Sequence, residues 1–452
     1  MIWNNVHRIY FIGIGGIGMS ALARYFNQSG KVVSGYDKTR TPLCDQLLSE
    51  GIQIHFNEDL DALDPKADLV VYTPAIPASH AEWLWYQQHG YTILKRSEVL
   101  QKISENMKAI CVAGTHGKTT VSTCISHILR HSQYGCHAFL GGISANYQTN
   151  YWSSESLTAV IEADEYDRSF LKLNPSVGVV TAMDPDHLDI YGTVEAMEQC
   201  YLEFIGKIND LLVYKHGLKH SRSFHAPQQY SYSLQNDAAD FYASDIEVHQ
   251  GTYRFQFNRK GEALGMLDLP IGGMHNVENT VAAATVALLL GVPFEKIQAA
   301  VAAFRGVKRR FEYVLHTADH VLIDDYAHHP EELRMLISST RNLFRDKKIS
   351  VVFQPHLYTR TRDLADGFAE SLDLADEVIL LPVYPARELP IEGVESEMIM
   401  ERMNHQQVHV LSKEGLLKWV EAAQPHVLVM AGAGDIDALV EPVSLILQKS
   451  IA

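Results

Sequence analysis

Residues 114–120, Gly-Thr-His-Gly-Lys-Thr-Thr, have the composition of a loop that binds phosphate groups. An apolar run at 109–112 precedes them and helical apolar spacing follows at 121–129, so the sequence predicts a strand, a glycine-rich turn and a helix. In that arrangement, backbone N–H groups face the phosphates, Lys118 neutralises their charge and a threonine hydroxyl reaches Mg²⁺. Val112 stands where the common motif has its first glycine, so a plain glycine turn before a helix is the alternative.

Two acidic clusters follow apolar runs further along the chain. The run at 159–161 leads into Glu-Ala-Asp-Glu-Tyr-Asp at 162–167, and the run at 177–181 leads into Asp-Pro-Asp-His-Leu-Asp at 184–189. Ligand sites of α/β proteins form beyond the carboxyl ends of parallel strands, so we expect at least one cluster to hold a metal ion or substrate. Helix N-capping by Asp and Glu is the alternative.

The N-terminal section carries a second glycine motif. Gly13, Gly15 and Gly18 fit GxGxxG between an apolar run at 8–12 and a helical pattern at 21–26, and a second strand ends at Asp37. The motif indicates a pyrophosphate at a helix N-terminus, and it fits NAD and a UDP group equally well.

The segment between these motifs and the last section has two further features. Alternation over residues 230–269 predicts antiparallel strands. His-Asn-x-x-Asn then places Asn276 and Asn279 one turn apart on a helix, where their amides can recognise a base edge or cap the helix. The cationic run Lys308-Arg309-Arg310 suits either a phosphate clamp or a solvated face.

The last section repeats an apolar strand followed by a polar turn. The turns are Asp-Asp-Tyr-Ala-His-His-Pro at 324–330, Gln-Pro-His-Leu-Tyr-Thr-Arg-Thr-Arg at 354–362, Val-Tyr-Pro-Ala-Arg-Glu at 383–388 and Gly-Ala-Gly-Asp at 432–435. This repetition predicts a parallel sheet with its polar side chains on one edge. The basic clusters around Arg360 and Arg387 suit a substrate carboxylate, or else structural ion pairs.

Bulk properties limit the classes of function. A chain of 452 residues with 46% apolar and 20% charged residues suggests a globular protein of about three domains. We expect an α/β protein with an N-terminal Rossmann-like domain at 1–104, a central P-loop ATPase-like domain at 105–308 and a C-terminal Rossmann-like domain at 309–452. The net charge of −16 argues against nucleic acid as a partner, and no apolar stretch is long enough for a membrane span. Five scattered cysteines favour a reducing, cytoplasmic location and argue against structural zinc.

The order of the motifs is more specific than any one of them. GxGGxGMS, AGTHGKTT, EADExDxSFL, DHLDxY, GxHNxxN, VKRRFE, DDYxHHPxE, QPHxYTRT, VYPARE and GAGD together resemble the Mur ligases, which build the peptide stem of the bacterial cell wall, over nearly the whole chain. The resemblance implies ATP-dependent amide bond formation through an acyl phosphate.

Within that family, the GIGGIGMS, DDYAHHPEE and VYPAREL stretches favour the member that adds L-alanine to UDP-N-acetylmuramate. The alternative within the family is attachment of a recycled tripeptide to the same sugar nucleotide. Outside it, a nicotinamide dehydrogenase leaves GTHGKTT and both acidic clusters unexplained, and a regulatory ATPase leaves the C-terminal His and Arg turns without a role.

The resemblance also implies roles for individual residues. Catalytic roles fall on Lys118, Glu162, His187 and Arg310. Mg²⁺ ligands are Thr119, Glu162 and His187. ATP contacts come from Gly114, Thr115, His116, Gly117, Lys118, Thr119, Thr120, Asn276, Asn279, Arg310 and Asp325. The UDP-sugar lies at Gly15, Gly16, Ser20 and Asp37. The amino acid lies at Tyr326, His328, His356 and Arg360.

Two departures from the family pattern bear on these roles. Leu357 stands where an Arg is common, which leaves the carboxylate of the amino acid to Arg360 or Arg362. Several members carry a carbamylated lysine after the metal-binding histidine, whereas no lysine lies between His187 and Lys207. The general base stays open among His187, His328 and His329, and the chain is expected to be a monomer or homodimer.

Overall fold

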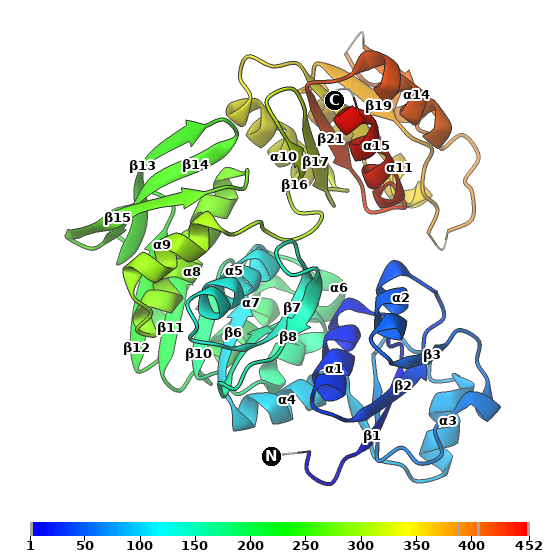
Figure 1. Cartoon of the computed structure of the whole chain (residues 1–452), viewed down its shortest axis with the longest axis vertical. Helices are drawn as coiled ribbons and strands as arrows, with labels where there is room; N and C mark the ends of the chain where they lie inside the picture. Colours follow the sequence, from blue (N-terminus) through cyan, green and yellow to red (C-terminus); the bar gives the residue numbers. More distant parts are fainter. Residues whose placement is uncertain (1–2, 387, 405–406, 450–452) are drawn as a thin grey trace. The chain divides into compact units, whose positions relative to one another are not determined.

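The computed structural model describes residues 3–386, 388–404 and 407–449. They form an α/β protein with three domains, each built on its own sheet, which confirms the expected fold class (Figure 1). The chain divides into two compact units. Unit 1 comprises residues 1–244, 256–267 and 278–301, and unit 2 comprises 245–255, 268–277 and 302–452.

The first sheet is fully parallel and has the strand order β3-β2-β1-β4-β5. Its strands are β1 (Arg8–Ile12), β2 (Val32–Tyr36), β3 (Gln53–His55), β4 (Leu69–Tyr72) and β5 (Ile93–Lys95). Its helices are α1 (Ile17–Gln28), α2 (Pro42–Ser49), α3 (Ala81–Gln88) and α4 (Arg96–Asn106). The strand order reverses between β1 and β4, so the Gly13–Gly16 turn after β1 lies where such sheets bind ligands.

The central sheet has the order β15-β14-β13-β12-β11-β10-β6-β9-β7-β8. Its strands are β6 (Lys108–Ala113), β7 (His137–Ser144), β8 (Thr149–Trp152), β9 (Thr158–Glu162), β10 (Val177–Val180), β11 (Leu211–Lys215), β12 (Gln228–Ser233), β13 (Phe241–His249), β14 (Thr252–Arg259) and β15 (Glu262–Leu269). Its helices include α5 (Lys118–His131), η2 (Tyr166–Lys172), α6 (Leu188–Tyr191), α7 (Val194–Ile205), α8 (Met274–Leu289) and α9 (Phe294–Ala302). Strand β6 pairs in parallel with β9 on one side and β10 on the other, so the two acidic clusters flank the loop that follows β6.

The expectation of antiparallel strands over 230–269 is only partly right. Strand β12 pairs in parallel with β11, and β13 pairs in parallel with β12 through Tyr232–Phe241 and Ser233–Tyr242. Two-residue turns at 250–251 and 260–261 then join β13, β14 and β15, a connection that only antiparallel neighbours allow. Alternation records that one face of a strand is buried, and it carries no information on the direction of the neighbouring strand.

The third sheet has the order β16-β17-β21-β18-β19-β20. Its strands are β16 (Glu312–His316), β17 (Val321–Asp325), β18 (Ile349–Phe353), β19 (Glu377–Leu380), β20 (Val408–Val410) and β21 (Val427–Ala431). Its helices are α10 (Pro330–Leu343), α11 (Tyr358–Asp363), α12 (Ala365–Leu372), α13 (Glu397–Met400), α14 (Lys413–Ala423) and α15 (Asp437–Lys449). The predicted parallel sheet is present, with β16 added antiparallel at one edge.

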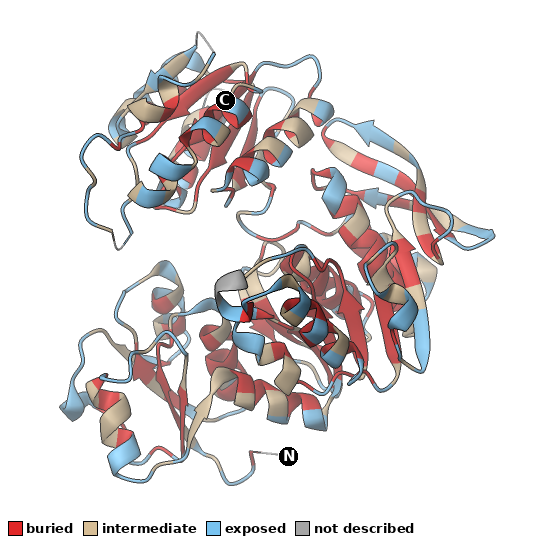
Figure 2. Ribbon diagram, turned by 180° about the vertical axis from the view of Figure 1, so that it is seen from behind, coloured by how far each residue is buried: buried red, intermediate tan, exposed pale blue. Residues whose placement is uncertain are grey.

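Buried strands and half-exposed helices give each sheet its core (Figure 2). Parallel strands such as β10 and β18 are buried along their whole length, as their largely apolar sequences predict. One hydrophobic cluster runs from the first sheet into the central sheet and includes Phe26, Phe139 and Tyr151. None of the described helices combines the length and the apolar character that a bilayer span requires.

A buried polar network also joins the first domain to the central one within unit 1. Arg24 is only 2% exposed, and its guanidinium donates to the carboxylate of Glu50 and to Oδ1 of Asn150 at 2.5 Å. Asn150, on β8, donates in turn to the carbonyl of Ile17 at 2.6 Å and to Oγ of Ser20 at 2.9 Å. Because buried polar groups are costly when unpaired, this network fixes the start of α1 against the β7–β8 hairpin.

We predict that Asn150→Ala lowers the free energy of unfolding of unit 1 by about 2 to 3 kcal/mol, because buried polar groups of Arg24 and Ser20 lose their hydrogen-bond partner. Urea unfolding followed by tryptophan fluorescence measures the change, since Trp152 lies two residues away and is buried. Ser153→Ala is the matched control: its hydroxyl makes one exposed hydrogen bond to Gln28, so its effect should stay within about 0.5 kcal/mol. Equal effects of the two substitutions would contradict the prediction.

Candidate functional site

The phosphate-loop sequence forms the predicted turn between β6 and α5. The segment after β10 holds it: the N–H of Thr115 donates to the carbonyl of Ala182 at 3.3 Å, and the hydroxyl of Thr181 donates to the carbonyl of His116. Gly117 has a φ of 81°, and a Cβ at this position would lie 2.7 Å from Oδ1 of Asn279. Both the left-handed backbone and the approach of Asn279 therefore require glycine here.

Helix α5 starts immediately after Gly117 and presents a positive N-terminus. No side chain caps it, and its first turn contains no acidic residue, so the partial charge of the helix end is left for an anion. Its 14 residues begin with Lys118, Thr119 and Thr120, and both threonines are buried. This is the local geometry that the sequence pattern predicts for phosphate binding.

Thr119 and Glu162 form a pair of oxygen donors beside the loop. The hydroxyl of Thr119 donates to Oε1 of Glu162 at 2.9 Å, and Oε2 of Glu162 accepts the N–H of Gly141 at 3.0 Å. A Cβ on Gly141 would meet this carboxylate at 2.4 Å, so the glycine permits its approach. Hard oxygen donors of this kind fit Mg²⁺, and the structure therefore brings together two of the three predicted metal ligands.

Lys118 folds back onto its own loop. Its ammonium donates to the carbonyl of Gly114 at 2.7 Å and to Oε1 of Glu165 at 2.8 Å, and Glu165 is only 1% exposed. Burial raises the pKa of Glu165 and is the largest influence on it, while the neighbouring ammonium of Lys118 acts in the opposite direction.

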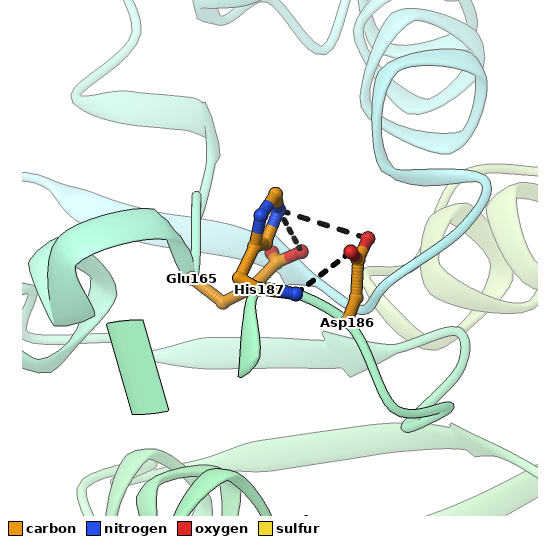
Figure 3. Close-up of side chains that lie close together, drawn as sticks. All are labelled: Glu165, Asp186 and His187. Carbon is orange, nitrogen blue, oxygen red and sulfur yellow. Dashed lines mark hydrogen bonds and ion pairs between the residues drawn. The ribbon is translucent and has the colours of Figure 1, made fainter. Parts of the chain in front are cut away.

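His187 lies with Glu165 and Asp186 (Figure 3). Its Nε2 is 4.0 Å from Oε1 of Glu165 and 3.7 Å from Oδ2 of Asp186. Within the part of the chain that the structure describes, this is the one group of three His, Cys, Asp or Glu residues whose donor atoms all lie within 4.8 Å of one another. The sequence prediction placed Glu165 in an acidic cluster but assigned the metal to Glu162 and His187, an assignment that stays a prediction; the structure adds Glu165 as a carboxylate close to His187.

The two asparagines of the HNxxN motif are both buried and have different contacts. Asn276 donates from its amide to the carbonyl of Gly272 at 2.6 Å, which is a contact at the start of its own helix. Asn279 packs on Gly117 of the phosphate loop. Recognition of adenine by the pair stays a prediction.

The glycine loop of the first domain is closed by Asp37. Oδ2 of Asp37 accepts the N–H of Gly15 at 2.8 Å, and its Oδ1 accepts the N–H of Thr39 at 3.0 Å. Gly16 is the N-cap of α1, and this helix also lacks a side-chain cap and an acidic first turn. Ser20 is fully buried, and its hydroxyl is bonded to Ile17 and Asn150. Of the predicted UDP-sugar residues, Gly15 and Gly16 therefore lie in one turn, Asp37 contacts that turn from the end of β2, and Ser20 makes hydrogen bonds inside α1 and to Asn150.

The predicted amino-acid residues gather in unit 2 beyond β17 and β18. The rings of His328 and His356 lie 6.2 Å apart, and those of Tyr326 and His328 lie 5.2 Å apart. NH1 of Arg360 is 3.4 Å from Nδ1 of His356, and burial together with this guanidinium lowers the pKa of His356. These residues form one cluster with a cation at its edge. Arg387, from the other basic turn, lies outside the described residues.

Two further predicted ATP contacts, Asp325 and Arg310, also belong to unit 2. Asp325 accepts the N–H groups of Phe311 and Ala327, each at 2.7 Å, and thereby orders the turn that carries Arg310. Arg310 itself is exposed. Its contact with ATP stays a prediction.

The buried carboxylate of Asp324 lies beside this turn. The carboxylate is 3% exposed and its Oδ2 is 3.8 Å from Nε of Arg309, while its Oδ1 has no hydrogen-bond partner among the described residues. Burial raises the pKa of Asp324 to about 7, and Arg309 only partly offsets this effect.

Comparison with known proteins gives one consistent result over the whole length. Three family models match: "Mur ligase family, catalytic domain" at 8–108, "Mur ligase middle domain" at 112–287 and "Mur ligase, glutamate ligase domain" at 309–434. A UDP-N-acetylmuramate–L-alanine ligase of Porphyromonas gingivalis is 47% identical over 451 residues, covering 98% of this chain and 99% of the relative. The ligase of the same name from Parabacteroides distasonis is 46% identical, with 99% of both chains covered.

Solved structures agree with this result. The crystal structure of a UDP-N-acetylmuramate-alanine ligase from Thermotoga maritima has a TM-score of 0.83 at 27% identity, and 98% of this chain and 99% of that chain are covered. A murein peptide ligase from Psychrobacter arcticus has a TM-score of 0.67 at 21% identity over 98% of both chains, which indicates a shared fold.

We predict that Asp324 makes the stability of unit 2 depend on pH. Its pKa is about 7 in the folded chain against an ordinary value of 3.8, so the folded state binds the proton more tightly, and stability falls as pH rises from about 4 through 7. Thermal unfolding of wild type and Asp324→Asn between pH 5 and 8 measures the difference. The wild type should lose stability relative to the variant by at most about 1.4 kcal/mol per pH unit. The exposed Asp319, as Asp319→Asn, is the control, and parallel curves for all three proteins would refute the assignment.

Proposed function

The chain belongs to the Mur ligase family, and from this premise we propose that it joins L-alanine to the carboxylate of UDP-N-acetylmuramate at the expense of ATP. End-to-end alignment with ligases of that name supports the substrates. The observation that carries the chemistry is the grouping of Lys118, Thr119 and Glu162 around the uncapped N-terminus of α5. ATP-dependent activation of a carboxylate requires such a place, where several negative charges can be held together.

The reaction has two stages. The lactyl carboxylate of the sugar nucleotide attacks the γ-phosphorus of ATP, ADP leaves, and an acyl phosphate forms. The amino group of alanine then attacks the acyl carbon, and inorganic phosphate departs from the tetrahedral intermediate. Both stages bring anionic oxygens together, so cations and helix N-termini must offset their repulsion.

Residues of unit 1 are proposed to bind the nucleotide. The N–H groups of the loop and of the first turn of α5 donate hydrogen bonds to the phosphates. The ammonium of Lys118 stabilises the negative charge on the γ-phosphate during transfer. The oxygens of Thr119 and Glu162 would hold Mg²⁺, as their chemistry fits that ion. Bound there, Mg²⁺ would neutralise phosphate oxygens and keep the carboxylate close to them.

The first domain is proposed to bring the sugar nucleotide. The turn at Gly15 and Gly16 precedes the uncapped N-terminus of α1, which suits the pyrophosphate, and Asp37 lies against that turn. Unit 2 is proposed to bring the amino acid, with Arg360 on its carboxylate and with Tyr326, His328 and His356 around it. Arg310 and Asp325 remain proposed ATP contacts of unit 2.

Release of phosphate under defined mixtures tests the whole proposal. Phosphate should appear only when ATP, UDP-N-acetylmuramate and L-alanine are all present, and alanine should be preferred to glycine, serine and the murein tripeptide. Preference for the tripeptide would assign the chain to recycling instead. Phosphate release without either acceptor would favour a plain ATPase, and a requirement for NAD(P)H would exclude the ligase.

Lys118→Ala should lower kcat by at least about a thousandfold, because the ammonium acts where negative charge accumulates in the transition state. The measurement is phosphate release at saturating substrates. Lys108→Ala is the matched control, since Lys108 begins β6, at the end of that strand farthest from the loop, and makes a surface ion pair with Asp210. Near-normal turnover of Lys118→Ala would remove the loop from the mechanism.

Arg360→Ala should raise the KM for alanine about tenfold or more and leave the KM for ATP nearly unchanged, because one charge-assisted contact is lost only for the amino acid. Arg362→Ala tests the alternative cation: Arg362 is 51% exposed and pairs with Asp363 at 2.7 Å, so its loss should leave the KM for alanine nearly unchanged. Steady-state kinetics with each substrate varied in turn separates the two. A larger change in the KM for ATP would instead move Arg360 to the phosphates.

A further inference from the structure

Glu165 is the most deeply buried acidic residue around the phosphate loop, and its carboxylate is close to two potential partners. The ammonium of Lys118 lies 2.8 Å from its Oε1. The imidazole Nε2 of His187 lies 4.0 Å from the same oxygen and 3.7 Å from Asp186. Figure 3 shows one ring nitrogen of His187 directed toward the carboxylates of both Glu165 and Asp186.

The carboxylate of Glu165 has unused capacity. Oε1 accepts the hydrogen bond from Lys118, whereas Oε2 lies equally close to that ammonium but accepts no hydrogen bond among the described residues. A buried carboxylate oxygen without a hydrogen bond is costly, and a cation is the natural group to satisfy it. At 1% exposure, water reaches this side chain poorly.

The donor atoms of Glu165, Asp186 and His187 are spaced for a shared ion. All lie within 4.8 Å of one another, and two carboxylates with one imidazole can hold Mg²⁺ or, more readily, Mn²⁺. Ligands of one such ion stand about 2.1 Å from it and therefore about 3 to 4 Å from each other. The distances from Nε2 of His187 to Glu165 and Asp186, 4.0 and 3.7 Å, are at the upper end of this range.

Lys118 opposes cation binding at this site as long as its ammonium stays beside Glu165. An ammonium 2.8 Å from the carboxylate neutralises the negative charge that would bind a divalent cation, and it also repels that cation directly. Phosphate groups on the loop attract the same ammonium toward the N-terminus of α5, so nucleotide binding frees Glu165.

We propose that Glu165 serves two cations in turn: it holds Lys118 before nucleotide binds, and it then ligates a divalent cation together with His187 and Asp186. The inference rests on the proposed function, since ATP is the group that displaces Lys118. It adds a ligand to the metal site, and it makes the second cation bind after the nucleotide, because the same carboxylate cannot fully serve both partners.

Binding of Mn²⁺ to the full-length protein without sugar nucleotide or amino acid tests this exchange. The free ion is titrated by electron paramagnetic resonance, and electron spin echo modulation from imidazole ¹⁴N reports ligation by His187. Wild type should show the imidazole signal with the non-hydrolysable analogue AMP-PNP and lack it without nucleotide. Lys118→Met should show the signal without nucleotide and bind Mn²⁺ about tenfold more tightly than wild type.

Two further variants assign the effect to Glu165. The double variant Lys118→Met/Glu165→Gln should lose the tenfold gain and the imidazole signal, because the amide cannot replace the charged ligand. Lys108→Met removes the same charge from the far end of β6 and should behave as wild type. A cation bound through Thr119 and Glu162 alone carries no nitrogen signal, and one bound through Glu162 and His187 would keep its signal in Lys118→Met/Glu165→Gln, so neither imitates the expected result.

Three outcomes would overturn the proposal. They are an imidazole signal in nucleotide-free wild type as strong as in Lys118→Met, a signal that survives Glu165→Gln, and no signal in wild type with AMP-PNP. The last measurement needs no substitution, so it decides the question even where a variant folds poorly. Because alanine and the sugar nucleotide are absent throughout, failure of the proposed ligation and failure of the exchange give different results.

Discussion

Compensation of negative charge around one helix N-terminus is the constraint on which the central domain depends. Strand β6 lies between β9 and β10, so Glu162 and Glu165 on one side and Asp186 on the other converge on the loop that we propose binds phosphates. Lys118 is the one cation that the loop sequence itself contributes, and it is already engaged with Glu165. An anionic ligand that binds here must therefore compete with Glu165 for Lys118. Divalent cations can supply the additional positive charge, because the oxygen donors present suit them.

The first domain packs against the central domain, and both belong to the same compact unit. Arg24 and Asn150 tie the start of α1 to the β7–β8 hairpin, and one hydrophobic cluster continues from Phe26 to Phe139. Helix α1 follows the glycine turn that we propose for the sugar nucleotide, and β7 contributes Gly141, which positions Glu162. The two helix N-termini proposed to bind phosphate groups are therefore held in one unit by packing and by buried hydrogen bonds.

Local patterns in the sequence predicted the parts that depend on local geometry. The loop from Gly114 to Lys118, the strands before each polar turn and the glycine turn at Gly15 all follow from residues adjacent in the chain. Contacts between distant segments could not be predicted. Examples are the approach of Glu165 to His187, the parallel pairing of β12 with β11, and the hydrogen bond from Asn150 to the hydroxyl of Ser20. A motif fixes which residues reach the carboxyl edge of a sheet, and the packing of neighbouring loops decides which of them face each other.

The loops that carry His187 and Leu357 each contain a residue other than glycine in a strained backbone conformation. His187 has a φ of 51° and Leu357 a φ of 70°, and each left-handed residue other than glycine costs about 1 to 3 kcal/mol unless its surroundings hold it. Both are held: the carbonyl of His187 accepts the N–H groups of Ile190 and Tyr191, and the N–H of Leu357 donates to Tyr384 while its carbonyl accepts Thr361. Leu357 replaces an arginine expected from the family pattern, yet its backbone still starts the helix that carries Arg360. Leu357 therefore starts helix α11 through its backbone but carries no charged side chain. Among the described residues of that cluster, the cation is Arg360, 3.4 Å from His356.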